Sequence, residues 1–156
     1  MASKRIPVSA ESLKAVVDYG IVGILVLLSI LSFAYAIERW IFYSRLDLRR
    51  YPSRRVLELD LSRRLGTLAT IGSSAPYIGL LGTVLAIILT FYAIGEQKGA
   101  IDTAAIMKDL ALALKATAAG LLVAIPASIF YNALMDRADR ILTRWEILRE
   151  AQNDHR

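Results

Sequence analysis

The chain has 156 residues, enough for one domain; 56% of them are apolar, and its mean hydropathy of +0.48 is higher than a soluble domain of this size needs. The absence of cysteine excludes disulfides and thiolate metal sites, and the single histidine, His155, has no nearby partner for catalysis or metal binding. The net charge of +5 comes from basic residues that flank apolar stretches, so it indicates membrane topology and not nucleic-acid binding. We therefore expect a membrane protein without a metal or cofactor.

An N-terminal segment, 1–18, precedes a first apolar segment, 19–37, which has nineteen residues without a charge. At about 1.5 Å per residue, a helix of this length crosses a hydrocarbon core. Trp40 follows where an interfacial aromatic anchor is expected. This segment predicts a first transmembrane helix.

A cleaved signal peptide is the alternative for this first segment, because Lys4 and Arg5 resemble a basic start and 34–36 (AYA) resembles a cleavage site. The apolar run is longer than a typical signal core, and an arginine-rich loop, 38–64, follows directly. Such a loop resists export, so we favour an uncleaved helix. The arginines of the loop are Arg39, Arg45, Arg49, Arg50, Arg54, Arg55, Arg63 and Arg64.

Two further apolar segments follow the loop. The segment 65–95 has no charged residue and as a helix is about 45 Å long, more than a bilayer requires, so it should project into the cytoplasm. A polar connection, 96–109, leads to the third segment, 110–134, whose single charge is Lys115. The sequence predicts an all-α integral membrane protein with three transmembrane helices, of which the second and third extend into the cytoplasm.

The distribution of basic residues predicts the orientation. The 38–64 loop and the tail, 135–156, carry thirteen arginines, whereas 1–18 and 96–109 carry five basic residues. The loop and the tail are therefore expected in the cytoplasm, with the N-terminus outside. The tail also carries an apolar stripe at three- and four-residue steps, which needs a partner: the arginine-rich loop, a neighbouring subunit or lipid headgroups. The stripe consists of Leu134, Ala138, Ile141, Leu142, Trp145 and Leu148.

Small residues recur at helical spacing in the second and third spans. Close backbone approach over small residues holds membrane helices together, so the stripes either pack these two spans on each other or also contact other copies or a central partner. In the second span the stripe is Ala75, Gly79, Gly82, Ala86, Thr90 and Ala93; in the third it is Ala113, Thr117, Gly120, Ala124 and Ala127.

Thr83 and Thr117 are polar members of these faces. They either bond their own backbone or line a polar path. Pro76 and Pro126 each remove a backbone hydrogen bond and are expected to kink their helices. Lys115 either extends to the outer headgroups or meets an acidic group of a partner near an outer pore mouth.

Carboxylates are absent from 61–95 and from 110–135. Proton-driven machines need a titratable group at membrane depth. A proton-handling role would therefore require a carboxylate from another chain.

Two motifs in order resemble the MotA/TolQ/ExbB proton-channel family. Residues 68–84 (LATIGSSAPYIGLLGTV) look like its second-helix signature, and 116–126 (ATAAGLLVAIP) followed by Tyr131-Asn132 look like its third-helix signature. The segments ATIGSSAP and LLVAIP are most similar to the ExbB branch of the family, which energises the TonB system. The two motifs together are far more specific than either small-residue stripe.

This resemblance implies a homopentamer in the bacterial inner membrane, formed around single-span ExbD-type helices that supply the protonatable aspartate and coupled to a TonB-like protein that drives iron uptake. The N-terminus would be periplasmic, and the family's pore-facing threonines fall on Thr83 and Thr117. The faces that pack or line the pore would include Pro76, Gly79, Gly82, Ala86, Thr90, Ala113, Gly120, Ala124 and Pro126.

The sequence departs from the family pattern in two places. Full-length members have a large cytoplasmic insertion where this chain has only 38–64, so no role of that domain is carried over. The glutamate of many relatives falls on Leu112, and Lys115 replaces an apolar position. A TolQ-like subunit of the Tol-Pal system and a structural scaffold are the alternatives to the ExbB-like role. The chain lacks the bases and nucleophiles of an enzyme.

Overall fold

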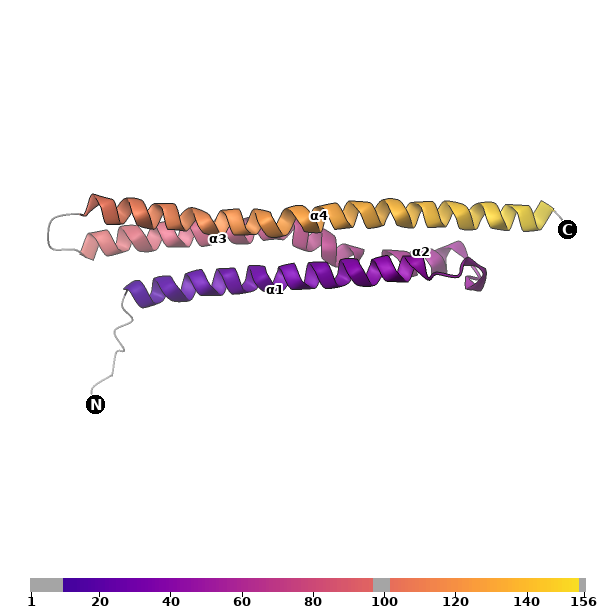
Figure 1. Ribbon diagram of the computed structural model, residues 1–156, viewed down its shortest axis with the longest axis horizontal. Coiled ribbons are helices and arrows are strands. Elements are labelled where there is room, and N and C mark those ends of the chain that lie inside the picture. The colour runs from indigo at the N-terminus through magenta and orange to yellow at the C-terminus, as the bar shows by residue number, and fades with distance from the viewer. Residues whose placement is uncertain (1–9, 97–101, 155–156) are drawn as a thin grey trace, which may run out of the picture. The chain divides into compact units, whose positions relative to one another are not determined.

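The computed structural model describes residues 10–96 and 102–154. In order along the chain, the elements are α1 (Ala10–Ser44), a 3-10 turn η1 (Leu48–Arg50), α2 (Arg54–Ser62), α3 (Leu65–Glu96) and α4 (Thr103–Asp154) (Figure 1). The features predicted on Lys4, Arg5 and His155 lie outside the described residues.

Three helical stretches are long and apolar enough to cross a membrane. They are Ser12–Ser44, Arg54–Glu96 and Thr103–Gln152. Each contains one of the apolar segments predicted from the sequence. The described part of the chain is thus all-helical with three candidate membrane spans.

The helices extend beyond the apolar segments that identify them. Helix α1 continues into the predicted 38–64 loop, which also holds η1 and α2. Helix α4 begins within the predicted 96–109 connection, where the Asp102 carboxylate accepts hydrogen bonds from the amides of Ala104 (3.0 Å) and Ala105 (3.2 Å). Charged residues end an apolar run without ending a helix; a side chain that caps the free amides sets the helix start.

Both prolines lie inside helices that continue past them. Pro76 is within α3 and Pro126 within α4. Each costs one backbone hydrogen bond, and the remaining bonds of the turn keep the helix uninterrupted.

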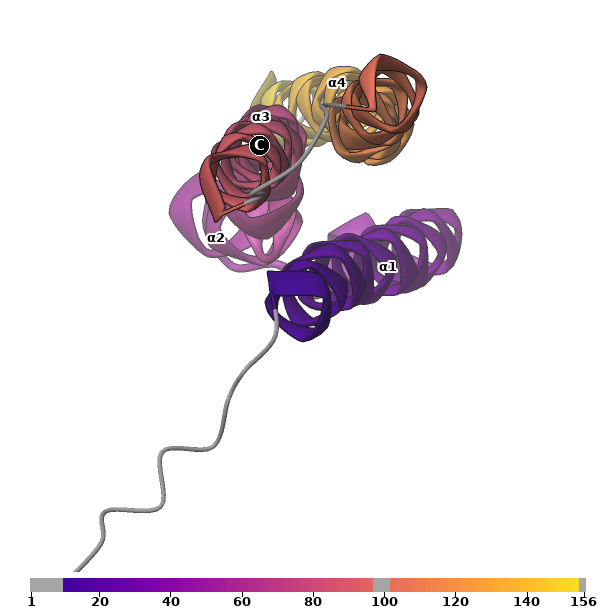
Figure 2. The same cartoon turned by 90° about the vertical axis from the view of Figure 1, so that its left-hand side faces the viewer.

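The chain forms two compact units, and α1, α3 and α4 each give a segment to both. The first unit holds the described residues up to Leu28 together with Ser74–Val123, and the second holds Ser29–Ser73 with the chain from Ala124 onward. In the first unit the three helix segments pack side by side, as the end-on view of Figure 2 shows. An ion pair of 2.6 Å between Lys14 and Asp109 joins α1 to α4 there.

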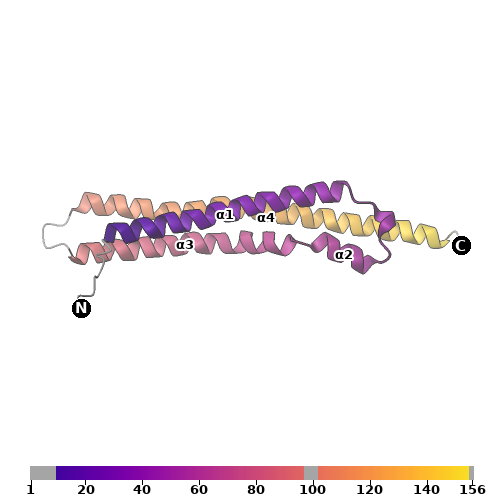
Figure 3. The same cartoon turned by 90° about the horizontal axis from the view of Figure 1, so that it is seen from below.

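The second unit has an apolar core, to which α2 contributes Leu57 and Leu61. Figure 3 shows α2 along the chain just before α3. The stripe of the tail packs into this core through Leu134 and Ala138, with Ile141, Leu142 and Trp145 against its edge. In the described structure the stripe contacts the segment 38–64 of the same chain, one of the partners that the sequence left open. Leu148 is exposed.

Candidate functional site

Helices α3 and α4 approach closest in the first unit, at two glycines. A Cβ added to Gly79 would lie 2.5 Å from the carbonyl oxygen of Ala116 and 3.1 Å from the Cα of Gly120. A Cβ added to Gly120 would lie 2.6 Å from the carbonyl oxygen of Ala75. No side chain fits at either position, so the two backbones are in direct contact.

The small residues around this glycine contact are buried within the chain. Gly82 faces α4 and α1 together, because a Cβ there would lie 2.8 Å from the Cβ of Ala116 and 2.9 Å from the Ile21 side chain. The other buried members of the stripes in this unit are Ala75, Ala86, Thr90 and Ala113. In the described structure, the two stripes therefore pack α3, α4 and α1 against one another.

The stripes continue into the second unit. Ala124 and Ala127 are buried there, and a Cβ added to Gly72 would lie 2.6 Å from the Ser128 hydroxyl. Pro126 on α4 is half-buried, as are Pro76 and Ala93 on α3. Small residues of the stripes are thus buried in both units.

A pair of threonine hydroxyls spans the α3–α4 contact beside the glycines. The hydroxyl oxygens of Thr83 and Thr117 are 2.6 Å apart, and either can be the donor. Thr83 is also within 3.2 Å of the carbonyl oxygen of Ala113 and 3.3 Å of that of Gly79. Thr83 is buried and Thr117 is half-buried, so Thr117 is the more exposed of the two.

The hydroxyl pair satisfies its own donors and keeps acceptor capacity. Each hydroxyl has one proton and two lone pairs. One proton can bridge the two oxygens while the other goes to the carbonyl of Ala113 or Gly79. Lone pairs on the threonine oxygens remain, so the pair can accept a proton donor that approaches from outside the chain.

Thr90 and Lys115 differ from this pair. Among the described residues, the Thr90 hydroxyl bonds only the carbonyl of Ala86, four residues earlier on its own helix (2.9 Å). Lys115 is exposed and forms no ion pair within residues 10–96 and 102–154. Leu112, at the family's glutamate position, is also exposed.

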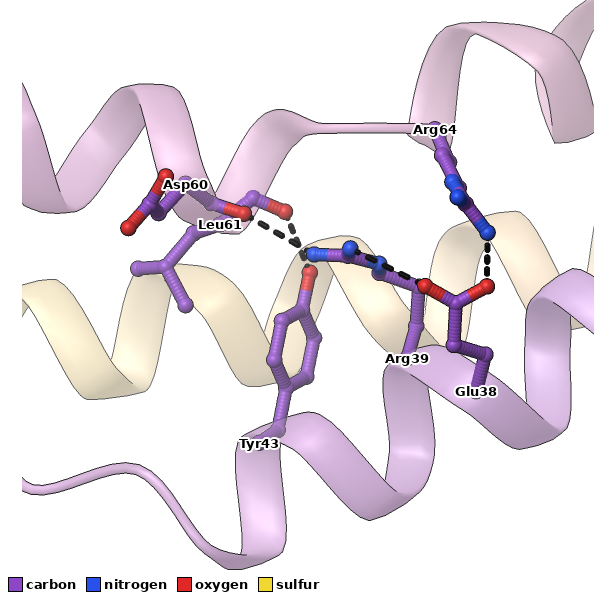
Figure 4. A network of polar contacts seen from close by, with 6 residues as sticks. All are labelled: Glu38, Arg39, Tyr43, Asp60, Leu61 and Arg64. Atoms are coloured by element: carbon purple, nitrogen blue, oxygen red, sulfur yellow. Dashed lines mark hydrogen bonds and ion pairs between the residues drawn. The ribbon is translucent and has the colours of Figure 1, made fainter.

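A polar network in the second unit was not predicted from the sequence (Figure 4). Arg39 is only 4% exposed, and its guanidinium donates to the backbone carbonyl of Asp60 (3.0 Å). Tyr43, one turn further along α1, donates its hydroxyl to the carbonyl of Leu61 (2.6 Å). Glu38 pairs with Arg39 (3.4 Å) and with Arg64.

These contacts cap the end of α2. The last four carbonyls of a helix have no partner inside it, and Asp60 and Leu61 are in the final turn of α2. The chain then turns at Arg64, whose φ of 67° is left-handed, and α3 begins. From the sequence, Arg39 indicates only membrane topology. Its spacing of four from Tyr43, on one helix face, is the signal that could have indicated a shared contact.

Metal binding has no candidate in the described ranges. No group of three or more His, Cys, Asp or Glu side chains there is arranged to hold an ion. The chemistry available in the α3–α4 contact is therefore that of hydroxyl and carbonyl oxygens.

Three long apolar helices, joined by glycine contacts and a hydroxyl pair, define a multi-pass helical membrane protein. Residues 34–147 match the model of the MotA/TolQ/ExbB proton channel family. The chain belongs to this family. That match covers the end of α1, α2, α3 and most of α4.

Similar proteins carry ExbB names. The chain is 56% identical over 86% of its length to the putative biopolymer transport protein ExbB-like 2 of Helicobacter pylori, of which the match covers 89%. It is 47% identical over 93% of its length to the biopolymer transport protein ExbB of Aquifex aeolicus, of which 98% is covered. The match to ExbB of Neisseria gonorrhoeae is 51% identical over 49% of the chain but covers only 34% of that protein. The first two relatives are matched over 89% and 98% of their length, so they leave little room for a large insertion in place of the segment 38–64.

Proposed function

We propose that the chain is an ExbB-type stator subunit of the inner-membrane motor that uses the proton-motive force to energise TonB-dependent transport across the outer membrane. In this proposal several copies, five by analogy with the family, form a ring around single-span ExbD-type helices. The N-terminus is periplasmic and the tail is cytoplasmic. Family membership and the ExbB names of relatives that match over most of the chain support this role.

The observation that carries the proposal is the Thr83–Thr117 pair in a part of the chain without carboxylates. From 61 to 95 and from 110 to 135 the sequence has no Asp or Glu, so the group that takes up a proton must come from a partner. The free lone pairs of the two oxygens can accept from the protonated aspartate of a partner, and a hydroxyl that gives up its bond within the chain can donate to the carboxylate form. Thr117, the less buried member, is the one that would meet the partner.

Many large apolar side chains on each long helix are exposed in the single chain. This surface suits a subunit that is surrounded by lipid and other helices. On α3 and α4 the exposed residues include Tyr77, Leu80, Leu81, Val84, Leu121, Leu122 and Ile125. A ring of copies would cover part of this surface and the lipid the rest. Lys115, exposed and without an ion pair in the described part of the chain, would meet outer headgroups or an acidic residue of the partner.

The test is to co-express the chain with the single-span protein encoded next to it and to measure the complex by native mass spectrometry. We expect several copies of this chain bound to the neighbour. Thr83→Val and Thr117→Val should keep that assembly but abolish growth on iron chelates. Thr70→Val is the matched control, because Thr70 is exposed on α3 and its hydroxyl bonds only the carbonyl of Gly66. A monomer that ignores the neighbour, or threonine variants that grow normally, would refute the motor role.

Two other functions can be distinguished from the ExbB-type role by experiment. The family also includes TolQ, and a Tol-Pal gene beside this one, or loss of envelope constriction in place of iron uptake, would favour that role. A purely structural scaffold is favoured by the fact that the Thr83 and Thr117 donors already have partners within the chain. The scaffold predicts that both Val variants assemble and function normally.

A further inference from the structure

Two adjoining grooves run along the second unit between α1 and α4. The larger, of about 490 Å³, is lined by Trp40, Asp136, Arg137, Arg140 and Arg144 among others. The smaller, of about 170 Å³, is lined only by apolar and aromatic residues, including Phe33, Ile37, Phe130 and Leu134. Trp40 and Ala133 line both grooves, so a polar pocket passes directly into an apolar one.

The polar groove carries a surplus of positive charge. Three arginines and one carboxylate, that of Asp136, line it. Arg137 is held in place: its guanidinium lies 4.5 Å above the Trp40 ring and donates to the Ser44 hydroxyl (3.1 Å). Arg140 and Arg144 are exposed and form no ion pair within residues 10–96 and 102–154. Their spacing of three and four residues places all three guanidinium groups on one face of α4.

Two phenylalanine rings in contact line the apolar groove. The rings of Phe33 and Phe130 meet edge to face with centroids 5.1 Å apart. Ile37 is 58% exposed and Trp40 is 54% exposed at its rim. An aromatic side chain with its indole between a charged and an apolar region is typical of the membrane interface.

We propose that these two grooves together bind one anionic phospholipid, with its phosphate among Arg137, Arg140 and Arg144 and an acyl chain along Phe33 and Ile37. The charge of the polar groove matches a net negative headgroup, which a zwitterionic lipid lacks. A free phosphate would leave the apolar groove uncovered. An amphiphile is the ligand that satisfies both halves at once.

The test uses the full chain purified in detergent and native mass spectrometry with added dioleoyl phosphatidylglycerol or dioleoyl phosphatidylcholine. We expect the unsubstituted chain to retain the anionic lipid in preference to the zwitterionic one. The double substitution Arg140→Gln and Arg144→Gln should lower retention of phosphatidylglycerol about tenfold, because each basic residue at a membrane surface contributes severalfold in affinity. Circular dichroism checks that each variant keeps its helices.

Two controls separate the parts of the proposal. Arg49→Gln with Arg55→Gln removes the same charge from exposed arginines outside the grooves and should leave retention unchanged. Ala133→Leu fills the shared position without changing the charge and should lower retention of both lipids.

Four results would overturn the proposal. Equal losses in both arginine pairs would mean general charge attraction, and equal retention of the two lipids by the unsubstituted chain would mean no headgroup selection. Complete competition by soluble glycerol phosphate would mean a phosphate site without a lipid. Dissociation of the oligomer by Arg140→Gln and Arg144→Gln, with lipid bound per chain unchanged, would mean that a second copy covers the grooves.

Discussion

Gly79 of α3 and Gly120 of α4 lie backbone against backbone, and a Cβ added to either would stand 3.1 Å from the Cα of the other. Within the first unit this contact sets how closely the two helices approach. The Thr83–Thr117 hydrogen bond lies beside it and depends on that approach, since hydroxyls on short side chains meet only when the backbones are close.

Gly79→Ala and Gly120→Ala should each destabilise the chain by about 1–3 kcal/mol, because the new methyl group collides with backbone atoms that cannot move away. Gly23→Ala is the control: nothing lies within 4 Å of its added Cβ, and alanine favours a helix by about 0.5–1 kcal/mol. Thermal unfolding followed by circular dichroism in detergent measures both. Equal stability of all three variants would show that α3 and α4 do not touch at the glycines.

Thr83→Val and Thr117→Val should show coupled losses of stability. A double-mutant cycle isolates the hydrogen bond between them, and bonds of this kind in membrane proteins contribute roughly 0.6–1.7 kcal/mol. The coupling should vanish when Thr83→Val is combined with Thr90→Val, because Thr90 bonds only its own helix. Strictly additive effects of Thr83→Val and Thr117→Val would contradict the 2.6 Å contact.

Tyr43→Phe should weaken the packing of α2. The substitution removes the hydroxyl that reaches the carbonyl of Leu61 and leaves a buried acceptor without a partner, which costs about 1–3 kcal/mol. Hydrogen exchange of the α2 amides should become faster. Tyr19→Phe serves as the matched change, because Tyr19 is 80% exposed. Equal exchange rates of the α2 amides in both variants would mean that the Tyr43 hydroxyl does not stabilise the end of α2.

The contribution of Tyr51 to the stability of the second unit should be lost at high pH. Burial, the hydrogen bond to the Asp60 carboxylate (3.0 Å) and its negative charge raise the pKa of Tyr51 above its ordinary 10.0, and Arg39 opposes this rise. Because the folded-state pKa is the higher one, the contribution to stability is complete below pH 10.0 and is lost as pH rises through the folded-state value.

Tyr51→Phe tests this pH dependence. The variant should be less stable than the unsubstituted chain at neutral pH, and the difference should shrink as pH rises above 10.0. Unfolding at a series of pH values measures it. A difference that stayed constant across that range would mean that the phenol does not titrate differently in the folded chain.

Periodicity and charge predicted much of the site and little of the second unit. The small-residue stripes identified the faces of α3 and α4, because only small residues allow close approach in lipid. The arginines of 38–64 indicate topology; the spacing of Arg39 from Tyr43 indicates at most a shared helix face, and not that Arg39 is buried while Arg55 is exposed. That difference depends on where the end of α2 comes to lie, which a contact across 21 residues decides.

The sequence by itself determined three apolar segments, their content of threonine and glycine, and the lack of a carboxylate within the second and third. These properties follow from which residues occur at which spacing along one helix. Only the tertiary structure decided that Thr83 meets Thr117, that Arg39 and Tyr43 cap α2, and that three arginines of α4 share a groove with Trp40. Each of these depends on the rotation of one helix against another, and side-chain packing between the helices fixes that rotation.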